Sequence, residues 1–192
     1  MSRGLGDVYK RQMLYSLTDG TFNLQELLTQ DAAAKNRLLQ YAAGHRSEAQ
    51  EFCWLAEPWD KTYLGFEDQA LTGRLQPFMM ARCLDARLAL AKLPVAESMS
   101  SGSVVVLLTD KMIERNNHLL QLRTSPGKLE AVSTLEQEEV TMDMGAFTQL
   151  YFGAFSASEL WEAGHIKCSD VQKLQLLDEL FPKCRTYNNE YF

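Results

Sequence analysis

The run "VVVLLTD" at residues 104–110 is the feature that most constrains how this chain can fold. It is a continuous apolar stretch rich in β-branched valine, which is typical of a strand covered on both faces. The stretch "ESMSSGS" just before it has the polar composition of a loop. A strand of this kind must lie inside a sheet, so we expect a sheet core in this part of the chain.

The segments around this run predict a mixed sheet covered by helices. Asp85 has the chemistry of an N-cap for a short helix that Pro94 closes. A hairpin is expected around Ser125, Pro126 and Gly127, because alternating segments flank these turn residues. The predicted strands are residues 77–84 ("PFMMARCL"), 104–110, 118–124, 128–133 and 139–144.

The last third of the chain is predicted to be helical. A short helix is bounded by the glycines of "GAFTQLYFG", and Ser156 with Glu159 forms a capping box for the next one. A third helix covers residues 171–181, where apolar residues recur at helical spacing until Pro182. Together with the sheet, these helices predict an α+β layer arrangement.

The earlier part of the chain predicts two strands, a helix and a third strand. "MLYSL" and "TFNLQELL" flank a turn at Thr18, Asp19 and Gly20, which indicates a hairpin. Asp31 is the expected N-cap of a helix that ends at Gly44. A strand before Pro58 completes a ββαβ fragment, which we interpret as the end of a larger α/β domain.

Residues 1–12 have no pattern of a signal peptide or a targeting helix. "DVYKRQ" back-translates to GAT GTG TAT AAG AGA CAG, which resembles a transposon adapter used in library preparation. We therefore interpret residues 1–12 as a sequencing-adapter artefact and expect the natural reading frame to continue upstream. The expected domains are residues 13–75 and 76–192, with a boundary at the weakly patterned "LTGRLQP".

Composition narrows the class of protein. With 46% hydrophobic residues and a net charge of −6, the 192-residue chain is typical of a globular protein and not of a nucleic-acid-binding one. No apolar run approaches the ~20 residues that span a bilayer, so no membrane partner is expected. Four cysteines without metal-ligand spacing predict reduced, mostly buried thiols in a cytoplasmic protein, with no metal site.

The sequence also lacks most catalytic motifs. No glycine-rich loop suits a phosphate group, so no cofactor is expected to bind these residues. His45, His118 and His165 have no Ser or Cys nucleophile beside them, and we assign them no role.

The end of the chain, "YNNEYF", is unusually aromatic. Chain ends are ordinarily polar and fray, whereas Tyr187, Tyr191 and Phe192 indicate a docked end. A carboxylate held in a partly desolvated pocket could also accept a proton from an amine, directly or through water. Spacing alone favours docking over chemistry.

Four stretches together carry a family resemblance: "QPFMMARCLD", "FTQLYFGAFSASELWEAG", "LLDELFP" and "NNEYF". In order and spacing they resemble the C-terminal part of the enhanced intracellular survival (Eis) family of Gcn5-related N-acetyltransferases (GNAT). The resemblance implies the end of a second, cofactor-free GNAT-like α/β domain at residues 13–75. It also implies a whole sterol-carrier-protein-2-like domain at residues 76–192.

The resemblance further implies an activity and a site. The intact parent would transfer acetyl from acetyl-CoA, its co-substrate, to a primary amine of the lysine or aminoglycoside type, and would be a homo-oligomer. The family's catalytic base is the C-terminal carboxylate, which corresponds to Phe192, and Tyr191 and Glu190 would line the acceptor pocket. The acetyl-CoA loop would lie upstream, so this fragment would bind no cofactor and would be inactive alone.

Two other functions remain open at this point. The second domain could carry a lipid or another apolar ligand in a tunnel lined by its Met and Phe residues. It could instead be a passive oligomerisation module, because exposed sheet edges invite pairing.

Overall fold

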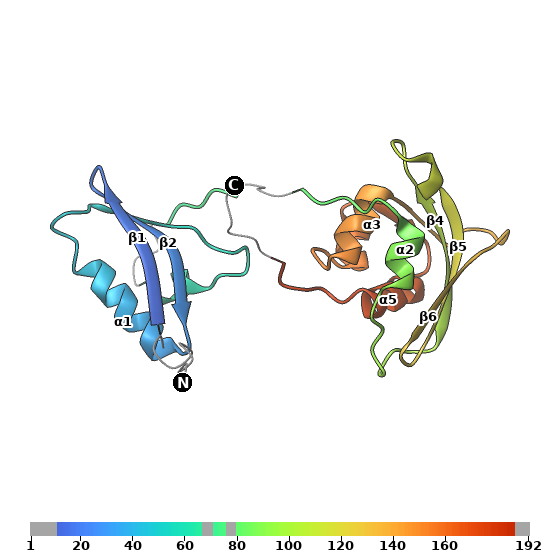
Figure 1. The fold of residues 1–192 in the computed structure, drawn as a ribbon, viewed down its shortest axis with the longest axis horizontal. Helices are drawn as coiled ribbons and strands as arrows, with labels where there is room; N and C mark the ends of the chain where they lie inside the picture. The colour runs from blue at the N-terminus through green and yellow to red at the C-terminus, as the bar shows by residue number, and fades with distance from the viewer. Residues whose placement is uncertain (1–10, 67–70, 76–79, 187–192) are drawn as a thin grey trace, which may run out of the picture. The chain divides into compact units, whose positions relative to one another are not determined.

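The computed structural model describes residues 11–66, 71–75 and 80–186. The chain divides into two compact units, Met1–Leu75 and Gln76–Phe192, and each is described by itself (Figure 1). Within the described residues, every helix is too short or too polar to cross a membrane.

The first unit is the predicted ββαβ arrangement. Its elements are β1 (Arg11–Thr18), β2 (Thr21–Thr29), α1 (Ala32–Ala43), β3 (Glu51–Trp54) and the 3-10 helix η2 (Thr62–Gly65). Strands β1 and β2 form an antiparallel hairpin, and β3 lies parallel to β2 after the crossover through α1. Asp19 and Gly20 have φ values of 50° and 75°, which is the geometry of a two-residue hairpin turn.

Strand β1 begins inside the stretch interpreted as an adapter artefact. Arg11 pairs with Thr29, and Gln12 pairs with Leu28. The sheet therefore includes the last two residues of that stretch. The origin of residues 1–12 stays a prediction.

The second unit is a mixed sheet with helices, so the predicted α+β class is confirmed. Its elements are α2 (Ala86–Ala91), β4 (Gly102–Thr109), the 3-10 helix η3 (Glu114–Asn116), β5 (His118–Ser125), β6 (Lys128–Ser133), β7 (Val140–Asp143), α3 (Met144–Tyr151), α4 (Ala157–Glu162), β8 (Ile166–Cys168) and α5 (Val171–Leu180). The strand order is β6-β5-β4-β7-β8, and only the β4–β7 pair is parallel.

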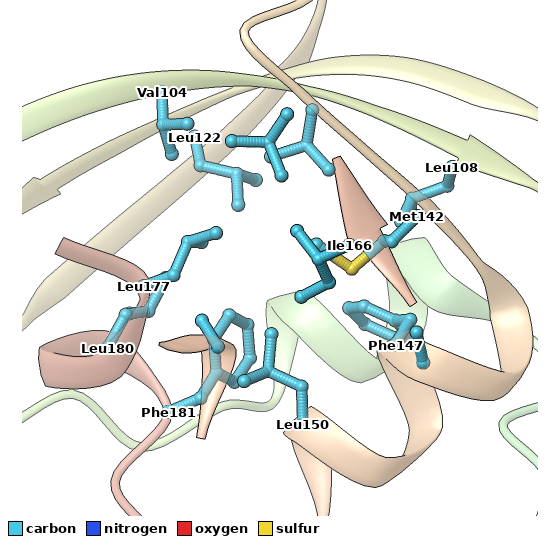
Figure 2. Close-up of a cluster of buried hydrophobic side chains, with 14 of the residues drawn as sticks. Val104, Leu108, Leu122, Met142, Phe147, Leu150, Ile166, Leu177, Leu180 and Phe181 are labelled. Carbon is cyan, nitrogen blue, oxygen red and sulfur yellow. The ribbon is translucent and has the colours of Figure 1, made fainter. Parts of the chain in front are cut away.

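Strand β4 is the central strand that the valine run predicts. Val104, Val105 and Val106 are all buried, and because successive side chains point to opposite faces, both faces of the strand are covered there. Helices α2, α3 and α5 lie on one side of the sheet (Figure 1). The core fills the space between these helices and the sheet, and Figure 2 shows side chains from both layers meeting there.

Two predictions about this unit were wrong. The described part of "PFMMARCL", residues 80–84, forms no strand, and residues 76–79 lie outside the described residues. Its backbone is bound by side chains instead, since Cys83 N donates to Thr148 Oγ1 at 3.0 Å and Leu84 O accepts from Asn116 Nδ2 at 3.2 Å. The last third is not entirely helical either, because β8 pairs with β7 at the sheet edge.

The cysteines also differ from the prediction. All four are free thiols, but only Cys83 is buried. Burial raises the pKa of the Cys83 thiol. Cys53 and Cys184 are exposed, because each lies where the chain runs along the surface of its unit.

A buried carboxylate holds the connection between β4 and β5. The Asp110 side chain has no exposed surface and pairs with Arg82. It also accepts hydrogen bonds from Met112 N at 2.8 Å, Ile113 N at 3.0 Å and Asn116 Nδ2 at 2.9 Å. The Asn116 amide is the main cause that lowers the pKa of Asp110, and the backbone amides act in the same direction.

This network predicts a loss of stability in acid. A lowered folded-state pKa stabilises the fold fully above the unfolded value of about 3.9, and the contribution disappears as pH falls through the folded value. We expect Asp110→Asn to lower the urea midpoint of the second unit at pH 7, and to lower it less at pH 3. Trp161 fluorescence reports this transition when Trp54 and Trp59 are replaced by Phe.

Asp85→Asn is the matched control, because it makes the same charge change at the N-cap of α2, where Asn caps equally well. Equal loss of stability at pH 7 and pH 3 for Asp110→Asn would show that the ionised carboxylate is not the stabilising group.

Candidate functional site

The start of helix α1 is the place where a strand–helix–strand unit would bind a phosphate. Free amides at a helix N-terminus attract anions. Here the Asp31 carboxylate occupies that position, because its Oδ1 accepts a hydrogen bond from Ala34 N at 2.6 Å. A pyrophosphate would meet a negative charge at this helix end, which is therefore unsuited to the phosphates of a cofactor.

A pocket of about 180 Å³ lies at the opposite end of α1, against β3. The rings of Phe22 and Phe52 stack with centroids 5.5 Å apart, and His45 lies 5.6 Å from Phe22. His45 follows the last turn of α1, and its Nδ1 is 3.4 Å from Glu48 Oε2. The pocket is lined by Phe22, Leu39, Ala42, Ala43, His45, Arg46, Ala49, Gln50, Glu51, Phe52 and Phe66.

The size and lining of this pocket limit what it can hold. Small-molecule sites ordinarily measure about 300–1,000 Å³, so this pocket is too small for a nucleotide cofactor. Its volume suits a group of the size of one aromatic ring. The sequence pattern shows His45 only as a residue after a helix end, so its place among aromatic rings was not predicted.

The other two histidines belong to the second unit. His118 is at the start of β5, where burial, aided by the Arg87 charge, lowers its pKa. It is therefore neutral at pH 7. His165 is exposed between α4 and β8. Among the described residues, neither imidazole forms a hydrogen bond or an ion pair with a nucleophilic or acidic side chain.

The chain after α5 is held against the second unit. Phe181 is 3% exposed and packs edge-on against Phe147, with ring centroids 6.2 Å apart. Cys184 N donates to Gly153 O at 2.8 Å. Lys183 Nζ lies 2.6 Å from Glu159 Oε1, and this contact is the main cause that lowers the pKa of Glu159.

The three predicted site residues, Phe192, Tyr191 and Glu190, lie outside the described residues, so their roles stay predictions. The structure does describe the chain up to Thr186. Six residues remain from there to Phe192, and a fully extended segment of that length reaches about 20 Å.

The core of the second unit is densely packed. The void among the side chains around Leu120, Phe147 and Leu177 offers about 10 Å³. This is about the space of one water molecule. Figure 2 shows several of these side chains pointing toward one another from the sheet and the helices. An acyl chain has no room in this core as it is packed here.

In residues 11–66, 71–75 and 80–186, no three His, Cys, Asp or Glu side chains are grouped so that they could hold a metal ion.

Comparison with known protein families gives two matches, in order along the chain. Residues 8–88 match the acetyltransferase (GNAT) domain, and residues 86–189 match the sterol carrier protein domain. No curated protein is similar enough to the chain to count as a match.

Several solved structures share the fold of this chain. A GCN5-related N-acetyltransferase from Anabaena variabilis has 18% identity and a TM-score of 0.73, and the match covers 95% of this chain and 47% of that one. A probable N-acyltransferase of Enterococcus faecalis has 21% identity and a TM-score of 0.74, with 88% and 43% covered. Eis1 from Mycobacterium abscessus has 17% identity and a TM-score of 0.62, with 90% and 44% covered.

The chain spans less than half the length of these solved structures. Because the sequence identities are only 17–21%, the similarity to these structures shows a shared fold alone. The sterol carrier protein match alone covers more than half of the 192 residues. The chain therefore belongs to the sterol carrier protein domain family, and the GNAT-like domain matched by residues 8–88 precedes that domain.

Proposed function

We propose that this chain is the C-terminal portion of an N-acetyltransferase that transfers acetyl from acetyl-CoA to a primary amine of the lysine or aminoglycoside type. The observation that carries this proposal is the order of the two domain matches, with GNAT at residues 8–88 and sterol carrier protein at residues 86–189. Similarly folded proteins include an N-acetyltransferase and a probable N-acyltransferase, each about twice as long as the chain.

In this proposal acetyl-CoA binds to a separate domain ahead of residue 13. The Asp31 carboxylate at the start of α1 supports this division, because it disfavours cofactor phosphates at the one strand–helix crossover of the described first unit. The chain contributes the end of a cofactor-free GNAT-like domain and the sterol carrier protein domain. It would catalyse no acetyl transfer alone.

The proposed base is the terminal carboxylate of Phe192, with Tyr191 and Glu190 beside the acceptor amine. The amine nitrogen attacks the thioester carbon, the carbon–sulfur bond breaks, and CoA leaves as the thiolate, which then takes up a proton. The proton lost by nitrogen passes to the carboxylate, directly or through water. An ordinary α-carboxyl pKa of about 3.5 is low for a base, so holding the attacking amine and a water molecule is part of this role.

The test uses the longer protein encoded by the reading frame that contains this chain. Adding one glycine after Phe192 moves the carboxylate by about 3.5 Å. We expect kcat to fall at least about 100-fold, as for the loss of a general base, with KM for acetyl-CoA unchanged. Release of CoA thiol in the presence of an amine measures both constants.

Phe192→Leu is the control, because it keeps an apolar last residue and leaves the carboxylate in place. It should retain most of kcat. An unaltered kcat in the glycine-extended protein would remove Phe192 from the mechanism.

A lipid-carrier function is the main rival, and the packed core disfavours it. We expect native mass spectrometry of the purified chain to show only the polypeptide mass, because the void of about 10 Å³ admits no acyl chain. A stoichiometric co-purified lipid would contradict this result and favour the carrier function.

We also propose a homo-oligomer for the longer protein. Strands β6 and β8 are the edges of the second sheet, where a further strand could pair. Each carries a lysine, and the Cys168 carbonyl of β8 already accepts a hydrogen bond from Trp161 Nε1 at 3.0 Å. Both features disfavour pairing at these edges. Association through other surfaces is therefore favoured over association through these edges.

A further inference from the structure

Helix α3 ends in a glycine turn that has a counterpart at the end of α4. Gly153 has φ +66°, its N–H donates to Leu150 O at 2.9 Å, and Ala154 N donates to Gln149 O at 2.9 Å. These two hydrogen bonds are those of a Schellman motif. Helix termination alone would therefore explain why a glycine stands at this position.

Gly164 ends α4 in the same way. Its φ is +78°, its N–H donates to Trp161 O at 3.0 Å, and His165 N donates to Leu160 O at 2.8 Å. The two glycines thus have the same backbone conformation and the same capping bonds. A side chain at either position would bear the same strain of a positive φ.

The surroundings of the two glycines differ sharply. A Cβ on Gly164 would meet no atom within 4 Å. A Cβ on Gly153 would lie 2.8 Å from Cys184 N and 2.8 Å from Pro182 O. Both of these are backbone atoms, so no side-chain rotation would relieve the overlap. The close approach is also what allows Cys184 N to donate to Gly153 O at 2.8 Å.

Two further contacts hold the short segment from Phe181 to Cys184, in addition to the hydrogen bond from Cys184 N to Gly153 O. Phe181 anchors its start in the core, and Lys183 is paired with Glu159 of α4. The segment from Phe181 to Cys184 is therefore bound to α3, to the turn after α3 and to α4. Lys183 and Glu159 are both substantially exposed, so their pair contributes little by itself. The hydrogen bond at Gly153 is the contact that requires a specific residue type.

We propose that Gly153 is a positioning residue, which fixes where the last residues of the chain leave the second unit by accepting the Cys184 amide at a turn with no side chain. This step rests on the proposed function: the same contact fixes the point from which the last residues start, and it thereby limits where the Phe192 carboxylate can reach. Gly153 itself touches neither substrate nor cofactor in this account.

The first test compares Gly153→Ala with Gly164→Ala in the chain itself. Both variants should lose thermal stability because both place alanine at a positive φ, and Gly153→Ala should lose more because its Cβ also overlaps the backbone of Pro182 and Cys184. Only Gly153→Ala should release the segment, and the initial rate of trypsin cleavage after Lys183 and Arg185 should rise at least about tenfold. Mass spectrometry of the products measures these rates. Equal cleavage rates in the two variants would overturn the proposal.

A second pair of variants removes the other half of the contact. Cys184→Pro lacks the N–H that donates to Gly153, whereas Cys184→Ala keeps it and loses only an exposed thiol. Trypsin does not cleave before proline, so the readout for this pair is cleavage after Arg185. Cys184→Pro should show faster cleavage there, and Cys184→Ala should match the wild type. If Gly153→Ala fails to fold, this pair tests the anchoring of the segment in its place. Equal cleavage rates of Cys184→Pro and Cys184→Ala would overturn the proposal.

The same variants in the longer acetyltransferase separate this inference from the proposed function. We expect Gly153→Ala to lower kcat at least about tenfold with little change in KM for acetyl-CoA, and Gly164→Ala to stay near wild type. A released segment with unaltered kcat would refute the role of Phe192 and leave the anchor standing. An unreleased segment would refute the anchor, whatever the activity.

Discussion

The hydrogen bond from Cys184 N to Gly153 O is the constraint on which the proposed site depends. It joins two parts of the chain that are far apart in sequence, the turn after α3 and the segment after α5. The bond requires a residue without a Cβ, because the backbone of Pro182 and Cys184 fills the space where one would lie. Beyond Phe181, the other described contact with the rest of the unit is the exposed Lys183–Glu159 ion pair. The Cys184–Gly153 hydrogen bond therefore determines where the final residues begin.

Local chemistry explains the parts of the fold that the sequence predicts well. Asp31 and Asp85 cap their helices with side-chain oxygens, and Ser156 with Glu159 completes a capping box. Each of these signals lies within a few residues of the element it starts, and the valine run similarly predicts β4. Such short-range patterns need no knowledge of the rest of the fold.

Contacts between distant residues explain what the sequence does not predict. The segment before α2 has the composition of a strand, but Thr148 and Asn116 bind its backbone from elsewhere in the unit. Strand β8 has only three residues and exists because β7 lies beside it. The glycine after α3 was recognised as a helix boundary, while its contact with Cys184 depends on the tertiary fold. The ring cluster around His45 likewise needs α1 and β3 to be placed together.

The two units contribute differently to the proposed enzyme. In the first, an aspartate stands where a phosphate-binding helix would leave its amides free, which fits a domain that keeps the GNAT topology without the cofactor. In the second, the void among the core side chains of the described residues measures about 10 Å³, which is too small for a lipid. Phe181, at the start of the segment after α5, is buried in that core. In the proposed enzyme, this second unit would hold the start of the terminal segment, and acetyl transfer would need the complete protein.

Hydrogen exchange at the Cys184 backbone amide, measured by NMR in the wild-type chain, tests most directly whether the segment after α5 is held at Gly153. If that amide is bound to Gly153 in solution, it should exchange at least about tenfold more slowly than in an unstructured peptide of the same sequence. Exchange at the unstructured rate would show that the segment is not held there, and the account of a positioned chain end would be contradicted.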